Sequence, residues 1–224
     1  MGHDHWFRSS DWDAKARAEF ETRLARARGD TRVQYRRIKA LALLESTDGI
    51  KATAGREMLL SIVHDGDAPR FEVVGALCLL GAHLHDTGAF AEAEVYLRHA
   101  LAVMGTNESG STGLEAIRLA EILLDRGRPD DLAEAQDLLE RRAADPPTFV
   151  ASRFRLALAA TRVALARGQA EVASDWARAA LTYASAKHSG LANHPTLLLA
   201  KANKSTRAWL ESVAAGKPRD TRKP

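Results

Sequence analysis

Histidine side chains are the residues of this chain that could bind a metal ion, but their spacing argues against such a site. His83 and His85 lie two positions apart in a stretch with helical periodicity, so their rings should point in different directions. His3 and His5 lie near the amino terminus, which we expect to be unstructured, and could hold Cu or Ni only weakly. The sequence contains no HExxH, CxxC or glycine-rich phosphate loop. We therefore expect no enzyme activity, no metal site and no cofactor.

The single cysteine indicates the compartment. Cys78 cannot form an intramolecular disulfide, and its position inside a predicted helix is typical of a small core residue. The start of the sequence lacks the apolar run of a signal peptide. No window approaches the roughly 18 consecutive apolar residues of a membrane span. We expect a cytoplasmic protein without a membrane anchor.

The composition favours helices. Hydrophobic residues make up 46% of the 224 positions and aromatic residues only 6%, while Ala, Leu and Arg are abundant. The formal net charge is +3, which the tail from Lys217 onward accounts for by itself. Residues 15–39 are basic and residues 108–145 are acidic, a polarity that solvated helix faces commonly produce. The sequence thus predicts an all-α fold.

Residues 74–107 contain the clearest pattern, two short amphipathic helices separated by a turn at Gly88. A helix pair of this kind leaves an apolar face uncovered and needs a similar neighbour. Glycines recur at spacings of 39, 39 and 41 residues, at Gly49, Gly88, Gly127 and Gly168. An alanine that allows close helix packing follows each of them, at Ala54, Ala93, Ala135 and Ala173. This spacing predicts four helix pairs between residues 31 and 186.

We expect the segments outside the repeats to cover the two ends of the repeat array. The first helix should run from about 11 to 28, capped by Ser10 with Asp13 and ended by Gly29, and Thr31 with Gln34 should cap the next. The predicted organisation is a capping segment at 1–30, repeats at 31–186, a capping helix region at 187–215 that begins near Asn193-His194-Pro195, and a disordered basic tail at 216–224. Trp6 and Trp12 could pack on the first repeat or form an exposed docking site.

The repeat resembles the tetratricopeptide repeat family, whose motif runs W-x2-L-G-x2-Y, A-x3-F and then a proline. The best match is Leu77, Leu80, Gly81, Leu84, Ala93 and Leu97, with leucines in place of the aromatic residues. Looser copies begin near Ile38, Ala116 and Ala157. The resemblance implies an α-solenoid of about four helix-turn-helix repeats that acts as a scaffold and binds a peptide or helix along the concave face formed by the first helix of each pair.

On that resemblance, the concave face implies a set of tentative partner-binding residues: Arg36, Lys39, His85, Glu121, Arg155 and Arg162. Arginine can hold carboxylates or phosphates through paired hydrogen bonds, so an acidic or C-terminal peptide is a conceivable ligand. Chance surface placement of these arginines is an equal alternative. The chaperone-binding branch of the family uses Lys followed by Asn one turn later, and Leu43 at that position after Lys39 argues against it.

Three hypotheses for function follow. The leading one is a non-enzymatic adaptor that binds another protein or peptide. The alternative is a regulatory module associated with nucleic acid through the basic first helices and tail, which the charge distribution disfavours. The third is self-association into a homo-oligomer through Trp6, Trp12 or the last helix.

Overall fold

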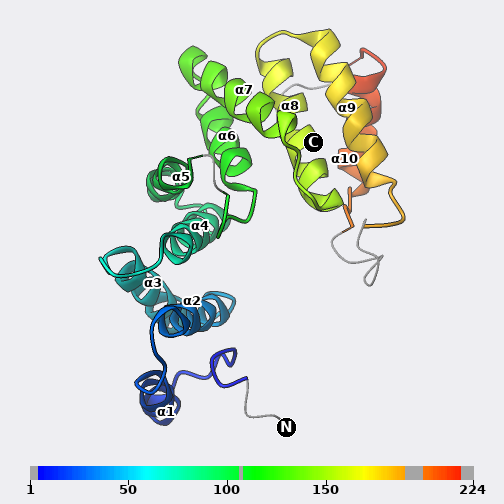
Figure 1. Cartoon of the computed structure of the whole chain (residues 1–224). Coiled ribbons are helices and arrows are strands. Elements are labelled where there is room, and N and C mark those ends of the chain that lie inside the picture. The colour runs from blue at the N-terminus through cyan, green and yellow to red at the C-terminus, as the bar shows by residue number, and fades with distance from the viewer. Residues whose placement is uncertain (1–4, 106–107, 190–198, 218–224) are drawn as a thin grey trace. The chain divides into compact units, whose positions relative to one another are not determined.

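A computed structural model shows that the chain divides into two units, residues 1–115 and 116–224. The structure describes residues 5–105, 108–189 and 199–217. Within these ranges it contains ten α-helices and no β-strand, which confirms the predicted all-α fold (Figure 1). No helix in this part of the chain is both long and apolar enough to cross a lipid bilayer. His3, the predicted helix start at 193–195 and most of the predicted basic tail lie outside the described residues.

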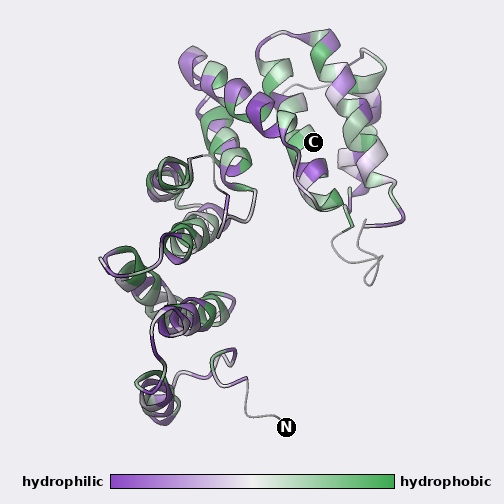
Figure 2. Cartoon of the chain, in the orientation of Figure 1, coloured by the Kyte–Doolittle hydropathy of each residue, from purple (hydrophilic) through white to green (hydrophobic). Residues whose placement is uncertain are grey.

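Unit 1 is built from packed neighbouring helices. They are α1 (Ala14–Leu24), α2 (Asp30–Leu44), α3 (Gly49–Val63), α4 (Arg70–Asp86) and α5 (Phe90–Met104). α2 packs against α3 and α4 packs against α5, while α4 also contacts α2 and α3. The helices carry hydrophobic and hydrophilic residues along the same segment, as amphipathic helices do (Figure 2). The helix pairs predicted at 31–64 and 74–104 are therefore present, with α4 beginning four residues earlier than the predicted stretch.

The closest approach in the second pair occurs at Gly81. A methyl group at this position would lie 2.7 Å from Cδ2 of Leu97, whose side chain is fully buried. The absence of a side chain on α4 thus makes room for a large one on α5.

The first pair is phased differently from the prediction. Gly49 is not a turn residue but the first residue of α3, which Asp48 caps by accepting a hydrogen bond from the Ile50 amide at 2.9 Å. The close approach falls at Gly55 rather than Ala54, because a methyl group there would lie 2.9 Å from the Ala40 carbonyl oxygen. The predicted turn and contact positions in this pair were wrong by one residue.

The predicted first helix is too long at both ends. α1 begins at Ala14, and the carboxylate of Asp13, not the hydroxyl of Ser10, accepts from the Ala16 amide at 2.8 Å. Lys39 occupies the carbonyl oxygens of Ser9 and Asp11, and a helix starting at residue 11 would need the second of these for its own backbone. The helix ends at Leu24, five residues before Gly29.

The second predicted capping box is also wrong. α2 begins at Asp30, so Thr31 already lies in its first turn, and its N-cap is Gly29, which has no side chain to donate or accept. Gly29 has a backbone φ of +52° and links the two helices instead of ending α1. The sequence signature therefore pointed to the right place for a helix start but to the wrong residues.

The loop before α6 (Glu115–Arg126) is tied down by a buried carboxylate. Glu115 accepts from the Thr112 amide at 2.9 Å and from its hydroxyl at 2.7 Å, and from the Ser111 hydroxyl at 2.9 Å. Burial alone would raise the pKa of Glu115, but hydrogen bonds from Thr112 and Cys78 outweigh it and hold the pKa below its ordinary value. Cys78 is a buried core residue as expected.

Unit 2 continues with helices α7 (Pro129–Ala144), α8 (Val150–Ala166), α9 (Ala170–Ala184) and α10 (Lys204–Ala214). α8 packs against both α7 and α9, and α9 packs against α10. Trp209, Leu210 and Val213 of α10 join the alanines of α8 and α9 in one core cluster. The last helix thus covers the end of the α8–α9 pair, and residues 199–203 before it are not helical.

The α4–α5 and α8–α9 pairs share one register. Both bounds of α8 and of α9 equal those of α4 and α5 shifted by 80 residues. The turns match as well: the Ala89 amide donates to Leu84 and the Gln169 amide to Ala164, and Gly88 and Gly168 have φ of +82° and +73°. At the positions of Gly81 and Leu97, unit 2 has Thr161 and Ala177, so the small residue has moved to the second helix. The helices and turns of the two pairs are therefore equivalent, and the small residue at the contact lies on the first helix in one pair and on the second helix in the other.

Candidate binding surface

The predicted partner-binding residues of unit 2 form ion pairs within that unit. Arg155 of α8 makes two hydrogen bonds to the carboxylate of Glu121 of α6, at 2.9 and 2.6 Å. One turn further along α6 and two turns further along α8, Arg162 contacts Asp125 at 3.1 Å. Paired charges of this kind hold α6 and α8 side by side and neutralise each other. These residues therefore stabilise the packing of the two helices, a role that we did not predict from the sequence.

Similar ion pairs link successive helix pairs in unit 1. Arg37 of α2 contacts Glu72 of α4 at 2.5 Å, and Arg56 of α3 contacts Glu92 of α5 at 3.0 Å. Glu72 is fully buried, and a methyl group on Gly75 would lie 2.9 Å from the Arg37 side chain. These pairs join residues 35 and 36 positions apart, close to the separation of Glu121 and Arg155. Arginine–carboxylate ion pairs thus recur between neighbouring helix pairs of the chain.

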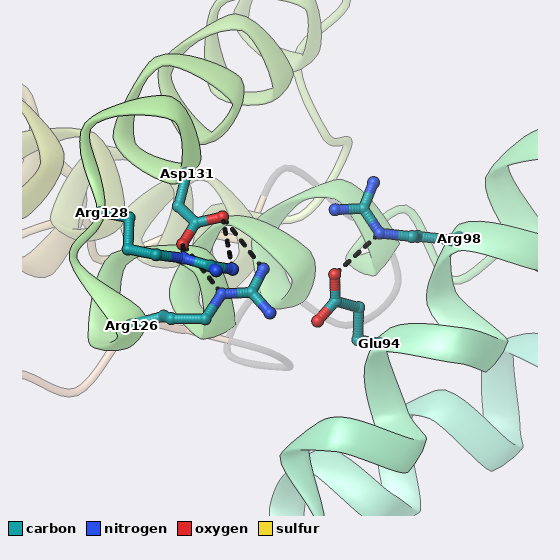
Figure 3. A network of polar contacts seen from close by, with 5 residues as sticks. All are labelled: Glu94, Arg98, Arg126, Arg128 and Asp131. Carbon is teal, nitrogen blue, oxygen red and sulfur yellow. Dashed lines mark hydrogen bonds and ion pairs between the residues drawn. The ribbon is translucent and has the colours of Figure 1, made fainter.

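Further charged groups stabilise turns and single helices. Asp131, at the start of α7, accepts from Arg126 and Arg128, with shortest distances of 2.8 and 2.7 Å (Figure 3). The same figure shows Arg98 donating to Glu94 one turn away on α5, at 2.8 Å. Hydrogen bonds from Arg128 and then Arg126 lower the pKa of Asp131, and those from Arg36 and the Asp67 backbone lower the pKa of Asp65.

We expect these carboxylates to make stability depend on pH. Because the folded-state pKa values of Asp65, Glu115 and Asp131 lie below the unfolded values of about 4, their contribution is present above that pH and is lost as pH falls through the folded values. The urea midpoint should therefore drop between pH 6 and pH 3. Asp131→Asn should be less stable than wild type at pH 6 and show a smaller drop. An equal drop in both proteins would contradict the assignment.

Lys39 lies in the interior instead of on a binding face. It is 1% exposed, and its ammonium group donates to the carbonyls of Ser9 at 2.6 Å and Asp11 at 2.9 Å. It also lies 5.3 Å from the Trp12 ring centroid and 5.6 Å from that of Phe20. Burial lowers the pKa of Lys39, and the nearby charge of Asp11 partly offsets this effect. Lys39 fastens the amino-terminal segment, so we leave it out of the binding surface.

The tryptophans belong to an aromatic cluster at the amino terminus. Trp6 has its ring centroid 5.1 to 5.5 Å from those of Phe7, Phe20 and Tyr35, and Trp12 packs edge-on against Phe20 at 5.8 Å. Both are partly buried, whereas Phe7 and Phe20 are fully buried. This observation supports the packing alternative for Trp6 and Trp12, and leaves one face of Trp12 at the surface.

That face of Trp12 lines a pocket between α1, α2 and α3, called here the α1–α3 pocket. Its volume is about 320 Å³. Its apolar lining comes from Trp12, Phe20, Leu24, Ala54 and Met58. Its charged lining consists of Arg17, Glu21, Arg32, Arg36 and Glu57. Concave sites that combine apolar and polar side chains are where proteins commonly bind ligands.

Most charges around this pocket have no partner of their own. Arg36 contacts Asp65 at 2.7 Å, while its Nε is buried without a hydrogen bond. Among the described residues, Arg17 and Arg32 make no ion pair, and neither do Glu21 and Glu57; Arg17 only lies over the Trp12 ring at 5.8 Å. Unlike the pairs of α6 and α8, these side chains are available to a ligand. Of the residues predicted from the sequence, Arg36 is the one that lines this pocket.

His85 lies elsewhere in unit 1. Its Nδ1 is 3.1 Å from a carboxylate oxygen of Asp86, and its ring packs edge-on against Phe90 at 5.5 Å. Burial lowers the pKa of the neighbouring His83, and the positive charge of Arg56 lowers it further. Neither histidine belongs to a metal-binding cluster among the residues that the structure describes.

Arg17 and Arg32 were not predicted from the sequence as pocket residues, whereas Trp12 was named as a docking site in one of two alternatives. The pocket exists because α1 folds over α2 and α3, a contact that no local pattern reveals. The spacing of Arg32 and Arg36, one helical turn apart, was the available signal that the two side chains share a face.

Comparison of the chain with protein-family models, with curated proteins and with solved structures found no match in any of the three.

Proposed function

We propose that the chain is a non-enzymatic adaptor built from tetratricopeptide-like helix pairs, and that the α1–α3 pocket binds a segment of a partner protein. Four helix pairs with a capping helix at each end form the proposed solenoid. The glycine spacing and the common register of α4–α5 and α8–α9 support a repeat origin. The single cysteine supports the proposed cytoplasmic location.

The α1–α3 pocket is the observation that carries this proposal. Its lining residues Phe20, Leu24 and Met58 can contact an apolar side chain of the partner. The guanidinium groups of Arg17 and Arg32 and the carboxylates of Glu21 and Glu57 can form charge-assisted hydrogen bonds around that anchor. A central apolar anchor within a polar rim is the usual arrangement of a protein–protein contact.

The predicted face on α6 and α8 contributes less to this proposal. Glu121, Arg155 and Arg162 already pair within unit 2, so a partner would have to replace existing hydrogen bonds to use them. Arg17 and Arg32 carry no such cost. Arginine and tryptophan are also enriched among the residues that dominate binding energy at interfaces.

Two charge-reversal variants test the proposal. Arg17→Glu with Arg32→Glu reverses the two unpaired arginines of the pocket. Arg26→Glu with Arg28→Glu makes the same change in net charge at exposed neighbouring positions that do not line it. Purified wild type and both variants are immobilised at equal density and incubated with native host lysate. We expect wild type and the control variant to retain the same proteins and the pocket variant to lose them.

The same experiment separates the nucleic-acid alternative. Binding to nucleic acid through general positive charge would weaken equally in both variants and disappear after nuclease treatment. Retention of the same proteins by the pocket variant at wild-type level would contradict the proposal. Circular dichroism spectra and melting temperatures of both variants, expected to match wild type, show that folding is intact.

A further inference from the structure

The second helices of successive pairs are connected differently in the two units. In unit 1, Arg56 of α3 and Glu92 of α5 form an ion pair with a contact of 3.0 Å. The 80-residue register places Gln136 of α7 and Val172 of α9 at these two positions in unit 2. Burial follows the same register, because Gly55 and Leu59 of α3 correspond to the buried Ala135 and Leu139 of α7. Unit 2 therefore lacks the arginine that forms this ion pair in unit 1.

A small pocket of about 20 Å³ lies at this place in unit 2, between α7, α8 and α9. The residues that line it are Gln136, Leu139, Glu140, Ala160, Val163, Ala164, Gln169, Val172 and Trp176. Its volume suffices for a group the size of one water molecule or one ammonium group. Val172 is 42% exposed and Glu140 is exposed at its rim, so the pocket can be reached from outside.

Two polar atoms of the residues that line this pocket are buried hydrogen-bond acceptors without a partner. The side-chain amide nitrogen of Gln136 donates to Glu140 at 2.6 Å, which leaves its Oε1 as an acceptor. Oε1 of Gln136 and Oε1 of Gln169 are both buried and have no hydrogen-bond partner. A buried acceptor left unpaired costs about 1 to 3 kcal/mol, so two of them in one pocket indicate a missing donor.

The charge of the residues that line the pocket indicates which kind of hydrogen-bond donor would bind there. Glu140 is the one charged side chain among the described residues that line the pocket, and the Trp176 ring adds a surface that attracts cations. We propose that this pocket binds the ammonium group of a lysine side chain from a partner protein. In unit 1 the corresponding position already carries a cation from the chain itself, Arg56, which pairs with Glu92. This site lies in unit 2, so it stands or falls independently of the α1–α3 pocket.

Solution NMR of the full-length protein labelled with ¹⁵N tests this site with defined probes. n-Butylammonium chloride supplies the ammonium group, n-pentanol is a neutral probe of similar size, and methylguanidinium represents arginine. We expect saturable shifts of the side-chain amides of Gln136 and Gln169 and of the Trp176 indole NH with n-butylammonium. The affinity for n-pentanol and for methylguanidinium should be about tenfold lower or less. Absence of saturable shifts, or equal or tighter binding of either control compound, would overturn the proposal.

A variant that fills its own pocket provides the matched test. Gln136→Arg with Val172→Glu installs in unit 2 the ion pair of unit 1. We expect this protein to keep or raise the melting temperature while its affinity for n-butylammonium falls at least tenfold. The control Ala133→Arg with Ala170→Glu makes the same substitutions in charge at exposed positions and should bind as wild type. Wild-type affinity in the self-filled variant would also overturn the proposal.

Discussion

Replacing Gly110 with alanine is expected to lower the free energy of unfolding by about 3 to 5 kcal/mol. Gly110 has a backbone φ of +89°, which L side chains rarely adopt. A methyl group there would lie 2.1 Å from the carbonyl oxygen of Phe71 and 3.2 Å from the amide nitrogen of Gly75. Both contacts are to backbone of α4, which cannot move aside as a side chain can. The loop would have to shift, and with it the hydrogen bonds that Ser111 and Thr112 donate to Glu115.

Urea denaturation followed by circular dichroism measures this effect, with Gly49→Ala as the control. Gly49 begins α3, and a methyl group there would meet no atom within 4 Å. Because alanine favours helix over glycine, the control should be unchanged or stabilised by up to about 1 kcal/mol. Similar stabilities of the two variants would show that the loop does not pack on α4 as described.

The second large effect is expected at Lys39. Lys39→Met keeps most of the side-chain volume but removes the donor to the carbonyls of Ser9 and Asp11, and should cost about 2 to 3 kcal/mol. It also removes the cation from beside Trp12 and Phe20. Since few contacts join α1 to α2, we expect the loss to appear first as local opening of the amino-terminal segment.

Hydrogen–deuterium exchange of α1 measures this opening. The amides of α1 should exchange faster in Lys39→Met than in wild type, while those of α4 and α5 keep their rates. Lys15→Met, on the exposed side of α1, removes a positive charge without removing a hydrogen bond and should leave the rates unchanged. Unchanged exchange of α1 in Lys39→Met would mean that the aromatic cluster alone holds the segment.

The sequence predicted best where structure is local. Gly88 and the residues around it specify the α4–α5 pair through a tight turn and one close contact, Gly81 with Leu97, all within about 30 residues. Gly127 and Gly168 also proved to be turn residues with positive φ. Gly49 failed as a turn because Asp48 caps α3 at that point, and a side-chain cap competes with a glycine turn for the same position.

Prediction failed where distant segments meet. Lys39 donates to the Asp11 carbonyl across a separation of 28 residues, and the local Ser10 signal gave no indication of this contact. The α1–α3 pocket likewise requires α1 to lie over α3. Glu121 and Arg155 were selected as binding residues, but their separation of 34 residues, close to one repeat, is also what an ion pair between neighbouring first helices requires. An acid and an arginine one repeat apart should be tested as an internal pair first.

We propose that the α1–α3 pocket contacts the partner protein. A binding titration with the partner recovered from lysate tests this contact most directly. Isothermal calorimetry would compare wild type with Arg17→Glu/Arg32→Glu and with Arg26→Glu/Arg28→Glu at one salt concentration. We expect at least tenfold weaker binding for the pocket variant, a loss of about 1.4 kcal/mol in binding free energy, and unchanged binding for the control. Equal affinities of the two variants would contradict it.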